Sequence, residues 1–111
     1  HLRALKGVKN TRENLLEAVT GETHEFKNMY PRMLEAAKSE GNKEAERSFN
    51  YANEVEKVHA RLYQKLLDNP GSTREAYSYY VCPVCGYTSE EEPPDTCPVC
   101  GAKGKMFKKI D

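Results

Sequence analysis

The sequence predicts a mainly α-helical chain that ends in a small β metal-binding module. Apolar residues recur at helical spacing between residues 15 and 66, and four cysteines stand as two close pairs near the C-terminus. A run of breakers, DNPGS at residues 68–72, separates the two patterns. We therefore expect two domains, a helical hairpin over residues 1–72 and a cysteine-rich module over residues 73–111.

Composition excludes several classes of protein. The formal net charge is +0 and charged residues make up 31% of the chain, so the protein is no basic nucleic-acid binder. The sequence has neither a run of about 18 apolar residues, as a membrane-spanning helix needs, nor a signal-type segment near its start. We expect a cytoplasmic protein that binds neither nucleic acid nor membrane. In a reducing compartment, paired cysteines favour metal binding over disulfides.

The first residues predict the end of one helix and the start of another. The chain begins with His1 rather than Met, and residues 1–7 are typical of the frayed end of a helix that Gly7 closes. We therefore expect residues to be missing upstream. Asn10 then offers an N-cap, with Glu13 three positions on as its capping-box partner.

A long amphipathic helix is expected after this cap. Pro31 removes a backbone donor and should kink the helix near Met29 and Tyr30, and Gly41 should end it. The helical stripe consists of Leu15, Val19, Glu22, Phe26, Met29 or Tyr30, Met33 and Ala37.

Two carboxylates of this helix approach the core together. Glu22 lies on the apolar stripe and Glu25 continues the adjacent row, one turn away. Burying both is costly without a cation. His24 falls off the stripe and should face solvent.

A second helix is expected over residues 43–67, antiparallel to the first. Its stripe contains Glu56 and His59 one turn apart, so both should point inward, where they need mutual hydrogen bonds or a metal ion. A single Glu-x-x-His is more often a solvated or hydrogen-bonded pair, but the inward acids of the first helix favour a metal site. The stripe consists of Ala45, Phe49, Ala52, Glu56, His59, Tyr63 and Leu66.

The cysteine pairs are the strongest local signal. Each Cys-x-x-Cys turn directs two sulfurs at one ion, and the glycine after it supplies the positive φ that the turn needs. About 35 residues are too few for a core alone, so metal binding should provide the folding energy. Short strands are expected around residues 79–81 and 106–108. The four ligands are Cys82, Cys85, Cys97 and Cys100, which suit iron and a structural zinc ribbon alike.

In order and spacing these motifs resemble the C-terminal part of rubrerythrin. The likeness covers essentially all 111 residues, from the third bundle helix of that family to its end. It implies half of a ferritin-like four-helix bundle with a di-iron site, followed by a rubredoxin-like domain with one Fe(Cys)4. The segments that carry the resemblance are Gly21-Glu22-Thr23-His24-Glu25, Met29-Tyr30-Pro31, Glu56-Lys57-Val58-His59 and the two cysteine knuckles.

The resemblance also implies an activity and roles for residues. The family reduces hydrogen peroxide to water in oxidative-stress defence, with NAD(P)H-linked electrons from a reduced donor protein or reductase passing through the rubredoxin-like iron. By position, Glu22, Glu56 and His59 resemble di-iron ligands, with Glu56 a bridge. Glu25 resembles a carboxylate that binds iron in the oxidised state, and Tyr30 resembles a hydrogen-bond donor beside the site. Zinc at either site is an alternative.

One departure from the family pattern concerns the number of ligands. A ferritin-like site takes a Glu from each of two helices and a Glu-x-x-His from each of the other two. This chain supplies one of each, since no further set precedes Glu22. We expect either a missing N-terminal half or a homo-oligomer, a dimer or higher, to complete the bundle. The alternative functions are a non-enzymatic zinc-ribbon interaction module on a helical hairpin, and ferroxidase activity or iron storage.

Overall fold

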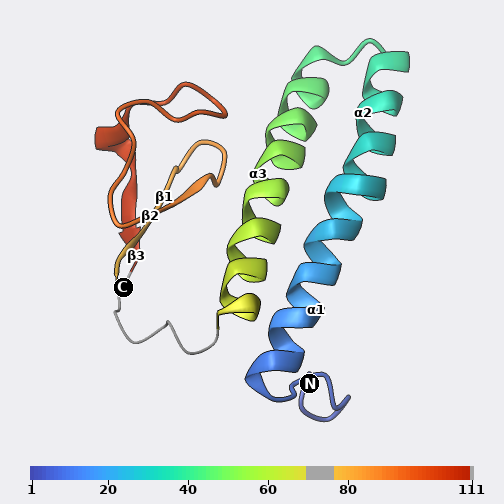
Figure 1. Ribbon diagram of the computed structural model, residues 1–111. Coiled ribbons are helices and arrows are strands. Elements are labelled where there is room, and N and C mark those ends of the chain that lie inside the picture. Colours follow the sequence, from blue (N-terminus) through green and yellow to red (C-terminus); the bar gives the residue numbers. More distant parts are fainter. Residues whose placement is uncertain (70–76, 111) are drawn as a thin grey trace.

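The computed structural model of the protein describes residues 1–69 and 77–110. It is mainly helical with a small three-stranded antiparallel sheet, as predicted. The helices form an antiparallel hairpin, and the sheet lies beside α3 on the side away from α1 (Figure 1). In chain order the elements are α1 (Thr11–His24), a π-helical turn (Glu25–Met29), α2 (Tyr30–Ser39), α3 (Lys43–Asp68), β1 (Tyr79–Val81), β2 (Thr88–Glu90), a 3₁₀ turn (Gly104–Met106) and β3 (Lys108–Ile110).

Helix α1 begins at the predicted cap. The Asn10 side chain accepts a hydrogen bond from the Glu13 amide at 2.8 Å, and the Glu13 carboxylate accepts one from the Asn10 amide at 3.3 Å. This reciprocal pair satisfies two amides that a helix start otherwise leaves without partners.

The hydrogen bonds of residues 1–7 are those of a helix end, as predicted: the Leu5 amide donates to the His1 carbonyl at 3.1 Å, and the Lys6 amide donates to the Arg3 carbonyl at 2.9 Å. The segment forms an isolated turn, and Lys6 rather than Gly7 has the left-handed backbone, with φ of 55°. The Gly7 amide donates to the Leu2 carbonyl at 2.8 Å and closes this turn. A left-handed residue between these two closing hydrogen bonds is the usual end of a helix, so the prediction differs from the structure only in which residue is left-handed.

The irregularity expected at Pro31 lies just before it. Residues Glu25–Met29 form a π-helical turn, in which the Tyr30 amide donates to the Glu25 carbonyl five residues back. Pro31 then stands in the first turn of α2. A first helical turn tolerates a residue without a backbone donor, and the widened turn ends at Met29, where the irregularity was predicted.

Gly41 ends the first helical arm as predicted, with φ of +69°. The next residue, Asn42, caps α3 by accepting a hydrogen bond from the Ala45 amide at 3.0 Å. The second helix predicted over residues 43–67 is confirmed as α3, which is one residue longer. The antiparallel hairpin is confirmed as well.

Two neighbours share the surface of α3. Its buried residues are Val55, Ala60 and Leu67, and Val55 faces Gly86 of the β module, where an added Cβ would lie 3.7 Å from its Cγ1. The predicted stripe of α3, including Phe49 and Leu66, is half buried. Helices α1 and α2 cover one side of α3, and the β module covers another.

The sheet has the order β2-β1-β3, with Tyr80 of the central strand opposite Ser89 and Lys109. The strand predicted over residues 79–81 is confirmed. The strand predicted over residues 106–108 begins two residues later, because residues 104–106 form the 3₁₀ turn. Strand β2 was not predicted, since its sequence Thr-Ser-Glu lacks a run of apolar residues.

The predicted domain boundary near residue 72 lies outside the described residues. Within residues 1–69 and 77–110, no helix combines the length and apolar character that spanning a membrane requires.

Candidate metal sites

Glu22, Glu56 and His59 meet between α1 and α3. Glu56 and His59 stand one turn apart on α3, and Glu22 faces them from the C-terminal part of α1. His59 Nδ1 lies 3.0 Å from Glu56 Oε2 and 3.7 Å from Glu22 Oε1. Ligand atoms of all three residues lie within 4.8 Å of one another, a spacing at which one ion can contact each of them.

The site concentrates negative charge in partly buried surroundings. The side chains of Glu22 and Glu56 are only 17% and 16% exposed. Burial, followed by the neighbouring carboxylates of Glu56 and Glu25, raises the pKa of Glu22 from 4.5 to about 8. Glu22 Oε2 is buried without a hydrogen-bond partner. In the described part of the chain, neither Glu22 nor Glu56 has a Lys or Arg within ion-pair distance.

The hydrogen bonds of His59 indicate where its proton lies. Its Nε2 faces the Gly86 carbonyl at 3.2 Å, and a carbonyl only accepts, so Nε2 carries the hydrogen. In neutral imidazole Nδ1 then presents a lone pair toward the carboxylates of Glu56 and Glu22. Three electron-pair donors that face one another repel unless a proton or a metal ion lies between them. The donor set therefore fits a metal ion well, because imidazole and carboxylate are ligands for iron and zinc.

Glu25 and Tyr30 border this group without joining it. Glu25 is the first residue of the π-helical turn and Tyr30 the first residue of α2. Burial, followed by the charges of Glu56, Glu25 and Glu22, raises the pKa of Tyr30. The Tyr30 phenol therefore stays protonated and able to donate a hydrogen bond near the carboxylates. His24 is exposed, as predicted.

The four cysteines form the second site. The Sγ atoms of Cys82 and Cys100 lie 3.6 Å apart, as do those of Cys85 and Cys97, and all four belong to one group of possible ligands. A tetrahedral ion with bonds of about 2.3 Å to sulfur separates its ligands by about 3.8 Å, so the group fits such an ion closely. Gly86 and Gly101, which follow the knuckles, have positive φ of 86° and 80° as predicted.

Burial and backbone hydrogen bonds shift the pKa of the cysteine thiols in opposite directions. Burial acts to raise the pKa of Cys82, but hydrogen bonds from the amides of Cys85 and Val84 lower it overall. Burial raises the pKa of Cys85 and Cys100. Without an ion the cluster therefore holds protons that a metal must displace, which makes binding depend on pH.

Sequence reasoning missed the residues that contact His59 from the β module. Thr88 Oγ1 lies 3.4 Å from His59 Nε2 and donates to the Gly86 carbonyl at 3.2 Å. The glycine carries a sequence signal, since it follows Cys85, but Thr88 carries none because its role depends on how the module packs against α3.

Comparisons with known proteins show the family of the chain. The family model described as rubrerythrin matches residues 2–67, and the model described as the rubredoxin-like domain of rubrerythrin matches residues 80–108. The chain belongs to the rubrerythrin family. Its fold is thus a ferritin-like helical hairpin followed by a rubredoxin-like domain, and both groups of ligands fit iron binding.

Relatives within the family include rubrerythrin-2 of Clostridium acetobutylicum, which is 44% identical over 95% of this chain and 58% of its own length. Nigerythrin of Nitratidesulfovibrio vulgaris is 34% identical over 78% of this chain and 43% of its own length. A solved structure of fully reduced, all-ferrous nigerythrin matches with a TM-score of 0.87 at 29% identity, over 93% of this chain and 50% of that one. The chain spans about half the length of the curated relatives that it matches.

Proposed function

We propose that the protein is a non-haem iron peroxidase of the rubrerythrin type, which reduces hydrogen peroxide to water with electrons that pass through an Fe(Cys)4 centre. The observation that carries the proposal is the position of His59. One ring nitrogen faces the carboxylates of Glu22 and Glu56, and the other faces the carbonyl of Gly86, the residue after Cys85. A single side chain thus connects the two candidate metal sites.

In this proposal the reaction consumes two electrons and two protons per peroxide and yields two waters. When bound, two irons with open coordination positions would supply the two electrons that cleavage of the O–O bond requires. Glu22 and Glu56 would hold the irons through their carboxylates, whose negative charge balances the charge of the metal. The Tyr30 phenol, with its raised pKa, keeps a proton available to hydrogen-bond a peroxide oxygen.

The electron supply follows from the chemistry of the cysteine site. Four thiolates leave no open position on an ion, so this site passes electrons and does not bind substrate. We propose that a reduced donor protein or an NAD(P)H-linked reductase feeds it. Zinc there would end the electron path and favour the alternative of a zinc-ribbon interaction module.

The proposed site is completed from outside the described residues. They contribute one Glu, Glu22, and one Glu-x-x-His, Glu56 with His59, whereas a ferritin-like di-iron site needs two of each. We propose that the second set comes from another copy of the chain in a dimer or from another part of a longer polypeptide. The exposed fraction of the apolar stripe of α3 gives either partner a surface to cover.

The test uses iron-loaded protein whose cysteine site is reduced and then mixed with peroxide. The ferric thiolate absorption should return quickly in the unaltered protein and at least about a hundredfold more slowly in Glu56→Ala, because the site loses a ligand. Glu54→Ala is the matched control, since Glu54 pairs with Lys57 on the same helix at 2.7 Å and is 46% exposed. Unchanged reoxidation in Glu56→Ala would contradict the proposal, whereas iron uptake with oxygen but no reaction with peroxide would favour ferroxidase activity.

A further inference from the structure

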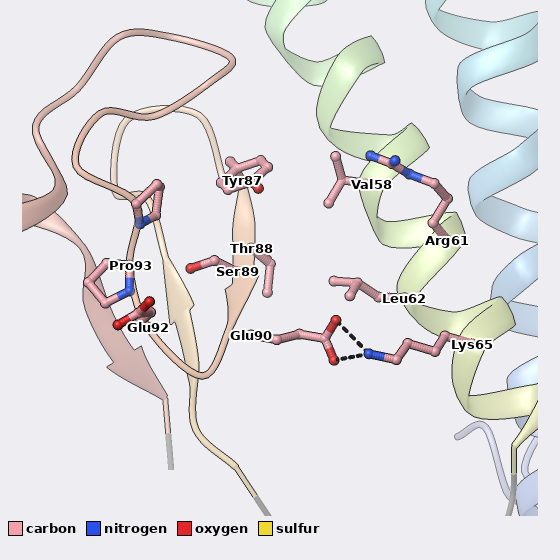
Figure 2. A pocket seen from close by; sticks show the side chains of 11 residues that line it. Val58, Arg61, Leu62, Lys65, Tyr87, Thr88, Ser89, Glu90, Glu92 and Pro93 are labelled. Carbon is pink, nitrogen blue, oxygen red and sulfur yellow. Dashed lines mark hydrogen bonds and ion pairs between the residues drawn. The ribbon is translucent and has the colours of Figure 1, made fainter. Parts of the chain in front are cut away.

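Strand β2 runs alongside α3 and touches it at two polar points. Thr88 and Glu90 are two residues apart, so both side chains leave the same face of the strand. Thr88 reaches His59, and both Glu90 oxygens accept hydrogen bonds from Lys65 Nζ, at 3.0 and 2.9 Å. Figure 2 shows the Glu90 carboxylate and the Lys65 ammonium facing each other across the gap between strand and helix.

Between these points the module and the helix are loosely packed. A cavity of about 530 Å³ opens there, and Val58 and Leu62 of α3 face it from one side while Tyr87 and Thr88 line it from the other (Figure 2). Close apolar packing is found instead at Val55, which is 2% exposed and lies against Gly86. The contact between the β module and α3 is therefore held by apolar packing near Gly86, before β2 begins. Near Glu90, where β2 ends, it depends on the charged contact with Lys65.

A third side chain strengthens this contact. The Tyr77 hydroxyl donates a hydrogen bond to Glu90, and Lys65 Nζ lies 5.8 Å from the centre of the Tyr77 ring. Burial acts to raise the pKa of Glu90, but the bonds from Tyr77 and Lys65 lower it overall. The bond to Glu90 and burial raise the pKa of Tyr77 to about 12. Glu90 thus stays ionised and Tyr77 stays a donor throughout the neutral range, so salt rather than pH should weaken the contact.

We propose that Lys65, Glu90 and Tyr77 form a charge latch that holds the rubredoxin-like domain against α3 and so keeps the Gly86 carbonyl on His59. The three are positioning residues, since none belongs to either group of candidate metal ligands. Without the latch the domain moves about its packed contact at Gly86. The hydrogen bond between His59 and the Gly86 carbonyl, which connects the two candidate metal sites, is then broken for part of the time. The kinetic consequence rests on the proposed function, but the docking itself does not.

The test compares Lys65→Glu, Glu90→Lys and the double exchange, with Lys43→Glu as control. Lys43 pairs with Glu46 at 3.2 Å at the other end of the same helix, away from the sheet. Zinc-loaded protein is studied by ¹⁵N relaxation, which shows whether the hairpin and the rubredoxin-like domain tumble as one body. We expect joint tumbling in the unaltered protein, the control and the double exchange. In each single variant the ratio of undocked to docked domain should rise about two- to fivefold, as befits an exposed ion pair.

A second readout uses iron-loaded protein, in which reoxidation by peroxide should slow in the single variants and recover in the double exchange. Tyr77→Phe removes only a hydroxyl and provides a milder variant if a charge reversal disturbs folding. Unchanged tumbling in Lys65→Glu, Glu90→Lys and Tyr77→Phe overturns the latch, as does a double exchange that recovers neither readout. If tumbling changes as expected while peroxide fails to reoxidise the unaltered protein, the proposed function is wrong and the latch is supported.

Discussion

Replacing Glu22 by Gln should stabilise the metal-free protein and weaken the metal-loaded one. The pKa of Glu22 is about 8 in the folded protein and near 4.5 in an unfolded chain, so the native state binds the proton more tightly. The stability that this proton contributes is fully present below about pH 4.5. It is lost as the pH rises and is gone above about pH 8. Gln keeps the shape of the protonated acid and cannot ionise, so the variant avoids the loss.

The magnitude follows from the same two values. The difference between about 8 and 4.5, at about 1.36 kcal/mol per pKa unit, bounds the loss at about 5 kcal/mol. The Glu22 side chain remains 17% exposed, and neighbouring carboxylates share its proton, so we expect about 2 kcal/mol. With metal bound, the sign reverses because the amide removes a charge that the ion requires.

The assay is urea denaturation of chelator-treated protein at pH 5 and pH 8.5. The unaltered protein should lose about 2 kcal/mol of unfolding free energy between the two, whereas Glu22→Gln should lose little. Glu17→Gln, at an exposed position on the same helix, is the control and should follow the unaltered protein. Equal pH dependence in the unaltered protein and in Glu22→Gln would refute the reasoning.

Three further predictions concern the elements around the sites. Gly104→Ala should destabilise the rubredoxin-like domain by about 3 kcal/mol, because the new Cβ would lie 1.9 Å from the Pro94 carbonyl oxygen; an unchanged midpoint of metal release in denaturant would contradict this. Asn10→Ala removes the capping box and should cost about 1 kcal/mol in thermal denaturation, and Asn10→Gly should cost less. Cys97→Ser should abolish tetrahedral metal binding, as measured by metal content, while helical circular dichroism persists; full metal content in this variant would contradict a four-cysteine site.

The sequence predicted those features that depend on local chemistry. The cap at Asn10, the stop at Gly41 and the glycine after each cysteine knuckle follow from the backbone geometry that these residues favour, and all are confirmed. The convergence of Glu22, Glu56 and His59 could also be predicted, because helical spacing placed each residue on an apolar stripe and the hairpin brings the two stripes together. Their role as iron ligands remains a prediction.

Features that depend on packing between the domains could not be predicted from the sequence. Strand β2 exists because it pairs with Tyr79–Val81, not because its own three residues favour a strand. The second hydrogen bond of His59 depends on where the β module lies.

The π-helical turn also determines how positions on the first helical arm are counted. Glu22 and Tyr30 are eight residues apart, which in a regular helix would leave them about 80° apart around the axis. The turn over Glu25–Met29 takes up about one extra residue, so the pair is spaced as if by seven, or two full turns. Tyr30 is thereby aligned with Glu22. Deleting the exposed Asn28 should restore regular winding with Tyr30 seven residues after Glu22, so Pro31 and every residue after it should keep their positions around the helix axis.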